Sequence, residues 1–208
     1  MESYNYKIKN FLENPIQHIE NPKIIEFGVR EGRSTKMFLD ICNKNNGELY
    51  SIDVDDYSHL YEDDKWTFIK TRDDNFDHLE KMIPKVLDII YLDSLHEADH
   101  VEKIFYHYFS KLKIGGYFFI DDTSWLPYLK SEKRSNFYCE INNKETFNRI
   151  LSIFQNNQEN LDLSFSFISS GMCMITKKKD NLNPPSKIKT RTFSIKNILK
   201  KMLNYINK

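Results

Sequence analysis

The sequence contains little of what marks disulfide-rich or membrane-spanning proteins. Its 208 residues include three cysteines, widely spaced at positions 42, 139 and 173, which favours neither a disulfide framework nor a zinc ribbon and is typical of a reducing compartment. No apolar run approaches the roughly 20 residues of a membrane span. The first fifteen residues also lack the apolar region of a signal peptide. These absences predict a cytoplasmic protein.

Net charge is absent as well, but the zero is the sum of two unlike parts. Lys177 to the end of the chain holds ten Lys and Arg and one Asp, a balance of +9, so twenty bases and twenty-nine acids, a balance of −9, remain in residues 1–176. At roughly 150 residues per domain, this length allows one domain with extensions. We expect an N-terminal helical segment over 1–20, a main domain over 21–178, and a basic linker with an amphipathic helix over 179–208.

Short apolar runs alternate with segments of helical spacing in the acidic part. Strands are expected at Lys23–Phe27, Glu48–Asp53, Trp66–Ile69, Leu87–Leu92 and Tyr117–Ile120, and a hairpin at Leu163–Ser169 and Met172–Thr176. Helices are expected at Ser34–Asn43 with Ser34 as N-cap, Phe76–Met82, Ala98–Leu112 ended by Gly115-Gly116, and Glu145–Phe154. This order predicts an α/β fold: a Rossmann-like, doubly wound, mostly parallel seven-stranded sheet with an antiparallel C-terminal hairpin.

In such sheets a ligand binds beyond the carboxyl ends of the strands. Gly28 and Gly32 follow the first strand, where they permit a tight turn and a close approach of the ligand to the next helix. The dinucleotide fingerprint G-x-G-x-x-G is absent, so an ordinary strand–helix turn remains an alternative. Asp53 ends the second strand and is placed to accept both ribose hydroxyls of a nucleoside, although Asp55 and Asp56 beside it also fit a solvated loop.

Carboxylates follow the two most apolar strands. Asp93 ends one of them, and Asp121 and Asp122 end the other. Because the carboxyl ends of adjacent parallel strands meet, the three side chains should converge and repel one another unless a cation lies between them, and an all-oxygen set favours Mg²⁺, Mn²⁺ or Ca²⁺ over zinc. The alternative is that Asp121 and Asp122 cap the following turn and Asp93 is simply exposed.

His96 lies three residues after Asp93 and is a candidate general base, since an imidazole beside a divalent cation stays neutral. The alternative is a histidine that caps or packs at a helix start. The other five histidines (18, 59, 78, 100 and 107) have no comparable surroundings and are expected to have no role in the site. Residues 96–100 also match H-E-x-x-H, the zinc-protease pattern, which we reject because here it follows a strand instead of lying inside a helix.

Two segments resemble the class I S-adenosylmethionine-dependent methyltransferases. IIEFGVREGRST resembles the E-x-G-x-x-x-G-x-S form of their first motif. YLDSLHEADHVEKIFYHYFSKLKIGGYFFIDD is similar to the D-x-x-H and GG…DD segment of metal-dependent O-methyltransferases, above all the subset of macrolide sugar methyltransferases and cephalosporin hydroxylase-like proteins. The resemblance covers residues 20 to 178.

The resemblance implies S-adenosylmethionine as cofactor and a hydroxyl of a sugar or glycosylated small molecule as methyl acceptor. It implies cofactor contacts by Glu26, Phe27, Gly28, Gly32, Ser34, Asp53 and, near the adenine, Asp73. It further implies Mg²⁺ or Mn²⁺ bound by Asp93, Asp121 and Asp122, with Asp93 and His96 catalytic and His96 as the base. Arg72 stands where the family commonly has glycine before the adenine-side acid.

Two other functions are compatible with the same fold: a catalytically silent cofactor-binding or scaffold protein, and an NAD-dependent oxidoreductase. The retained acids with His96 argue against the first, and the missing third glycine argues against the second.

No nucleic-acid partner is expected, and a homo-oligomer remains open. Residues 123–143 are candidates for a lid over a polar substrate, through Trp125, Tyr128, Lys130, Lys133, Arg134, Phe137 and Tyr138. Residues 193–206 have the pattern of a basic amphipathic helix, which predicts docking on a protein partner or peripherally on the inner face of the membrane.

Overall fold

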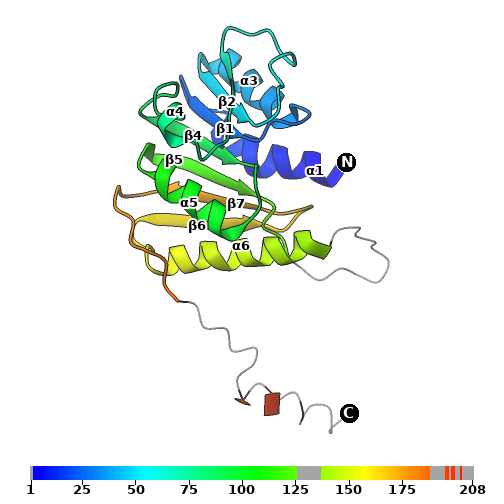
Figure 1. Cartoon of the computed structure of the whole chain (residues 1–208), viewed down its shortest axis with the longest axis vertical. Coiled ribbons are helices and arrows are strands. Elements are labelled where there is room, and N and C mark those ends of the chain that lie inside the picture. The colour runs from blue at the N-terminus through cyan, green and yellow to red at the C-terminus, as the bar shows by residue number, and fades with distance from the viewer. Residues whose placement is uncertain (1, 126–136, 188–194, 197, 200–201, 203–208) are drawn as a thin grey trace.

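A single seven-stranded sheet organises the part of the chain that the computed structural model describes, residues 2–125 and 137–187 with Ile195, Lys196, Ile198, Leu199 and Met202 (Figure 1). The strands lie in the order β3-β2-β1-β4-β5-β7-β6. Their bounds are β1 (Lys23–Phe27), β2 (Glu48–Asp53), β3 (Trp66–Lys70), β4 (Leu87–Leu92), β5 (Leu112–Asp121), β6 (Leu161–Ser166) and β7 (Met172–Lys177). Strands β1 to β5 run parallel, and β7 is antiparallel to both β5 and β6, which confirms the predicted fold class.

The register brings the ends of the central strands level with one another. Phe27 of β1 pairs with Leu92 of β4, and Leu92 pairs with Ile120 of β5. The residues that follow these three strands therefore stand side by side at the carboxyl edge of the sheet, as the sequence predicts for Gly28, Asp93 and Asp121.

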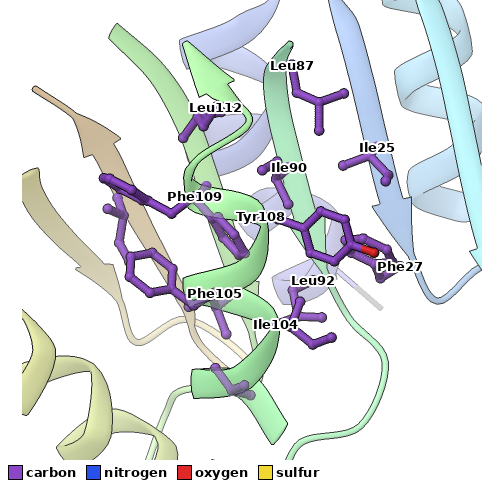
Figure 2. Packing of buried hydrophobic residues seen from close by; sticks show 14 of the residues in the cluster. Ile25, Phe27, Leu87, Ile90, Leu92, Ile104, Phe105, Tyr108, Phe109 and Leu112 are labelled. Atoms are coloured by element: carbon purple, nitrogen blue, oxygen red, sulfur yellow. The ribbon is translucent and has the colours of Figure 1, made fainter. Parts of the chain in front are cut away.

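Helices cover both faces of the sheet because alternate residues of each buried strand point to opposite sides. One face packs against the N-terminal segment α1 (Glu2–Lys7), η1 (Ile8–Glu13) and α2 (Asn14–Ile16) and against α3 (Arg33–Asn45). The other packs against α4 (Phe76–Leu79), α5 (Ala98–Phe109) and α6 (Phe137–Gln155). Figure 2 shows how α5 inserts Ile104, Phe105 and Tyr108 over β1, β4 and β5.

Four local predictions are wrong at element ends. The helix predicted over Glu145–Phe154 begins earlier, at Phe137. The helix predicted over Ala98–Leu112 ends at Phe109, and Gly115 and Gly116 lie inside β5. The pairing of β4 with β5 is irregular between Leu87 and Ile89, and the two glycines lie in this irregular stretch, Gly115 with a φ of +82°. Helix α4 spans four residues instead of seven, and Gly32, not Ser34, is the N-cap of α3, in the left-handed conformation.

Much of the predicted lid and tail falls outside the described residues. Tyr128, Lys130, Lys133 and Arg134 are among the residues that are not described, as is most of the segment 193–206. The described apolar residues of that segment, Ile195, Ile198, Leu199 and Met202, are exposed. Within the described ranges, no helix has the length and apolar character needed to cross a membrane.

Candidate active site

A cleft of about 980 Å³ opens at the carboxyl edge of the sheet, near the upper end of the size range of small-molecule sites. It is lined by the segments that follow β1 to β5 and by the N-terminal helix. The predicted residues Gly28, Ser34, Asp53, Asp73, Asp93, His96, Asp121 and Asp122 all line it. The structure thus brings together most of the predicted site, whereas Glu26, Phe27 and Gly32 are not among the lining residues.

Gly28 sits where the loops after β1 and β4 touch. Its φ is +94°, and a Cβ atom built on it would lie 2.2 Å from the carbonyl oxygen of Asp93. The Gly28 N–H donates to the carbonyl of Ile52 at 2.9 Å, and the Asp93 N–H donates to the carbonyl of Phe27 at 2.8 Å. Only a residue without a side chain fits between these backbones, so the floor of the cleft is backbone that a ligand can approach closely.

Glu26 lies behind the cleft wall, with no exposed surface. Its carboxylate accepts hydrogen bonds from the hydroxyls of Ser34 at 2.5 Å, Thr35 at 2.8 Å and Ser51 at 2.7 Å. Burial raises the pKa of Glu26 from 4.5 to about 7, although the three hydroxyls lower it. Glu26 therefore joins β1 to the first turn of α3 and to β2. Phe27 points to the opposite face, where its ring packs on Tyr108.

Replacing Glu26 by glutamine is expected to remove a pH dependence of stability. The folded state holds a proton that the unfolded chain releases, so the stability of the wild type falls as pH rises from about 4.5 through about 7. The loss at pH 8 is on the order of 3 kcal/mol. Urea unfolding at pH 5 and pH 8 should show Glu26→Gln gaining that much relative to wild type at the higher pH. The exposed control Glu20→Gln should track the wild type; parallel curves for all three proteins would contradict the prediction.

Asp53 and Asp73 form one end of the cleft. Asp53 Oδ2 accepts the N–H of Val29 at 2.8 Å, which fixes its carboxylate against the glycine turn. Asp73 Oδ2 accepts the hydroxyl of Ser94 and lies 2.8 Å from His100 Nε2. Both carboxylates are thus held in place at the positions that the resemblance assigns to ribose and adenine.

His100 corrects the expectation that it has no role. It is nearly buried, lines the cleft and holds Asp73, which is 27 residues away in the sequence. A lone histidine in the first turn of a helix gives no local signal of this contact. Only the packing of α5 against the loop after β3 reveals it.

The other end of the cleft is acidic. His96 Nε2 lies 3.5 Å from Asp93 Oδ1 and 3.5 Å from Asp122 Oδ2, and the three side chains are 30%, 28% and 26% exposed. Partial burial, followed by the negative charges of Asp121 and Asp122, raises the pKa of Asp93 well above its ordinary value. A positive charge placed beside Asp93 would therefore favour its ionised form.

Asp121 has different surroundings from the other two carboxylates. It is 3% exposed, and its Oδ1 lies 2.5 Å from Lys7 Nζ of α1 and accepts the N–H of Asp122 at 2.9 Å. The Tyr91 hydroxyl lies 3.1 Å from Oδ2 of Asp121 and 3.1 Å from Oδ2 of Asp93. Within the described part of the chain, no group of three His, Cys, Asp or Glu side chains is arranged to hold a metal ion. Metal binding by all three aspartates stays a prediction.

The N-terminal helix contributes two residues that sequence reasoning missed. Tyr4 lines the cleft, with Lys7 Nζ 5.3 Å and Arg33 Cζ 5.9 Å from the centre of its ring. Burial and the neighbouring charges of Asp93 and Asp121 raise the pKa of Tyr4 above its ordinary value. Neither residue lies near a motif in the sequence, and both reach the site because α1 packs beside the ends of β4 and β5.

Residues 25–123 match a family described as a methyltransferase domain. Among curated proteins, no sequence match was found. A putative caffeoyl-CoA O-methyltransferase from Staphylococcus aureus has a similar structure, with a TM-score of 0.58 and 16% identity over 85% of this chain and 81% of that one.

Two further solved structures have the same fold. MycE methyltransferase from the mycinamycin biosynthetic pathway, in complex with Mg and SAH, has a TM-score of 0.58 and 18% identity over 91% of this chain and 51% of that one, so the present chain spans about half its length. A putative rRNA-methylase from Clostridium thermocellum has a TM-score of 0.59 and 13% identity over 85% of this chain and 95% of that one.

Proposed function

We propose that this chain, which has the domain and fold of a class I S-adenosylmethionine-dependent methyltransferase, methylates a hydroxyl of a sugar or glycosylated small molecule with the help of Mg²⁺ or Mn²⁺. The observation that carries the proposal is the continuity of one cleft. It joins Asp53 and Asp73 at one end to Asp93, His96 and Asp122 at the other. A nucleoside cofactor and an acidic, histidine-containing acceptor site are therefore within reach of each other.

The end of the cleft at Asp53 and Asp73 suits the cofactor. Asp53 is anchored by the Val29 N–H and lies where a ribose would meet the end of β2. The left-handed turn at Gly28 exposes backbone to the methionine part, and Ser34 lines the cleft while its hydroxyl is held by Glu26. Asp73, fixed by Ser94 and His100, faces the adenine side.

The acidic end suits a hard divalent cation. Asp93 and Asp122 line the cleft with oxygen donors on either side of His96. When bound, such a cation polarises an acceptor hydroxyl and lowers its pKa.

The chain itself positions the reactants and moves the proton. The acceptor oxygen forms a bond to the methyl carbon as the carbon–sulfur bond of the cofactor breaks, which leaves S-adenosylhomocysteine. His96, between Asp93 and Asp122, accepts the hydroxyl proton, and the two carboxylates stabilise the imidazolium that results. The backbone at Gly28 holds the cofactor in line with the acceptor, which is the main source of rate in a displacement of this kind.

Binding and transfer measured on the same protein test the proposal. We expect S-adenosylhomocysteine to bind in a calorimetric titration, and tritium from methyl-labelled S-adenosylmethionine to enter sugars, glycosides or nucleotide sugars in the presence of Mg²⁺. EDTA should abolish transfer, and added Mn²⁺ or Mg²⁺ should restore it.

Each alternative has its own outcome in this experiment. Cofactor binding without transfer to any hydroxyl acceptor would indicate a silent cofactor-binding protein. Incorporation into RNA in place of sugars would contradict the substrate class, and transfer that EDTA leaves undiminished would contradict the metal. Binding of NAD in place of S-adenosylhomocysteine would overturn the proposal altogether.

A further inference from the structure

Asp121 is the least available of the three carboxylates at the acidic end. Its Oδ1 meets the Lys7 ammonium and the N–H of Asp122, and its Oδ2 meets the hydroxyl of Tyr91. Two residues after Phe119, it lies on the face of β5 that the N-terminal segment covers, so its side chain turns toward α1. Its Oδ1 is thus engaged by two protein donors, whereas its Oδ2 shares the single hydroxyl proton of Tyr91 with Asp93.

Lys7 is equally committed to this contact. Its side chain has no exposed surface, and its Nζ lies 2.5 Å from Asp121 Oδ1, 3.0 Å from Ser170 Oγ and 3.4 Å from the carbonyl of Gly171. A buried ammonium that loses its partner is strongly destabilising. Separating Lys7 from Asp121 to free a metal ligand would therefore require α1 to move away from the sheet.

The charges of the acidic end match one divalent cation when Lys7 is included. When all three are ionised, as metal binding requires of its carboxylate ligands, Asp93, Asp121 and Asp122 carry three negative charges, and Lys7 carries one positive charge, which leaves two negative charges. Mg²⁺ is usually held by one or two carboxylates, with water and substrate oxygens completing its octahedron. Asp93 and Asp122, which line the cleft on either side of His96, supply that number.

We propose that the Lys7 ammonium is a permanent positive charge beside the acceptor site. Its ion pair with Asp121 keeps that carboxylate from binding the metal and leaves Asp93 and Asp122 as the metal-binding carboxylates. This inference rests on the metal dependence in the proposed function, and it changes the ligand set that the resemblance implies. Lys7 is then a positioning residue. It sets the charge of the site through Asp121 and anchors α1, with Tyr4, against the cleft.

Mn²⁺ titrations followed by electron paramagnetic resonance test this assignment on the full-length chain. Lys7→Met should bind Mn²⁺ at least about tenfold more tightly than wild type, because Asp121 then adds an uncompensated charge nearby. The double variant Lys7→Met/Asp121→Asn restores the charge of the wild-type site and leaves no unpaired buried ion. It should bind Mn²⁺ within about threefold of wild type, whereas Asp93→Asn and Asp122→Asn should each weaken binding at least about tenfold.

Lys9→Met, an exposed lysine on the adjoining turn, is the matched control and should bind Mn²⁺ as wild type does. If the double variant kept the wild-type unfolding temperature but its Mn²⁺ affinity fell as much as that of Asp93→Asn, Asp121 would be a ligand and the proposal would be overturned. Unchanged Mn²⁺ affinity in folded Lys7→Met would do the same, since a purely structural lysine would alter only the unfolding temperature. Absence of Mn²⁺ binding in wild type that still binds S-adenosylhomocysteine would overturn this inference and the metal dependence of the proposed function, but not the cofactor assignment.

Discussion

Replacing His96 by alanine is expected to lower kcat for methyl transfer by about 10²- to 10⁴-fold, the usual range for a lost general base. The imidazole lies between Asp93 and Asp122 inside the cleft, and its Nε2 is 3.5 Å from an oxygen of each carboxylate. Because it lies at the acceptor end, the affinity for S-adenosylhomocysteine should stay within about threefold of wild type. Steady-state kinetics at saturating cofactor, together with calorimetry, measure both quantities.

His100 provides a matched control four residues away. Its contact with Asp73 places it at the nucleoside end, so His100→Ala should act mainly on the cofactor and raise its KM at least about tenfold. His96→Ala should therefore change mainly kcat, whereas His100→Ala should change mainly the KM for the cofactor. If His96→Ala retained full turnover, or if the two variants had the same kinetic effect, the assignment of the two ends of the cleft would be wrong.

Substituting Gly28 by alanine is the change expected to damage the cleft most directly. The new methyl group would lie 2.2 Å from the carbonyl oxygen of Asp93, which is backbone and cannot rotate away, and the φ of +94° is unfavourable for alanine. The ends of β1 and β4 must then separate. We expect a loss of stability of about 3 kcal/mol or more and a loss of cofactor affinity of at least about 100-fold.

Gly115→Ala separates the two causes. Gly115 also has a positive φ, +82°, but a Cβ built there meets nothing within 4 Å. This variant carries the backbone strain alone, so it should cost about 1 kcal/mol and leave S-adenosylhomocysteine binding unchanged. Denaturant unfolding and calorimetry on both variants check the prediction. Equal stability losses with unaltered binding would show that the close approach at Gly28 does not shape the site.

Much of the site could be predicted from the sequence because the fold places the carboxyl ends of the parallel strands side by side. Asp53, Asp93 and Asp122 each follow an apolar run, and parallel strands bring such residues to one edge of the sheet. Glu26, which the resemblance assigns to the cofactor, is not among the residues that line the cleft. The alternation within β1 points its side chain at three hydroxyls behind the cleft wall.

The sequence by itself determined the order of the elements, the sheet and the edge at which the ligand site lies, because apolar periodicity and turn residues act over short stretches of chain. Only the tertiary structure decided how the charges at that edge are paired. Lys7 reaches Asp121 across 114 positions, and His100 reaches Asp73 across 27. Such contacts depend on how α1 and α5 pack against the sheet, which no local pattern records. They distinguish Asp121, which lines the cleft but is paired with Lys7, from Asp93 and Asp122.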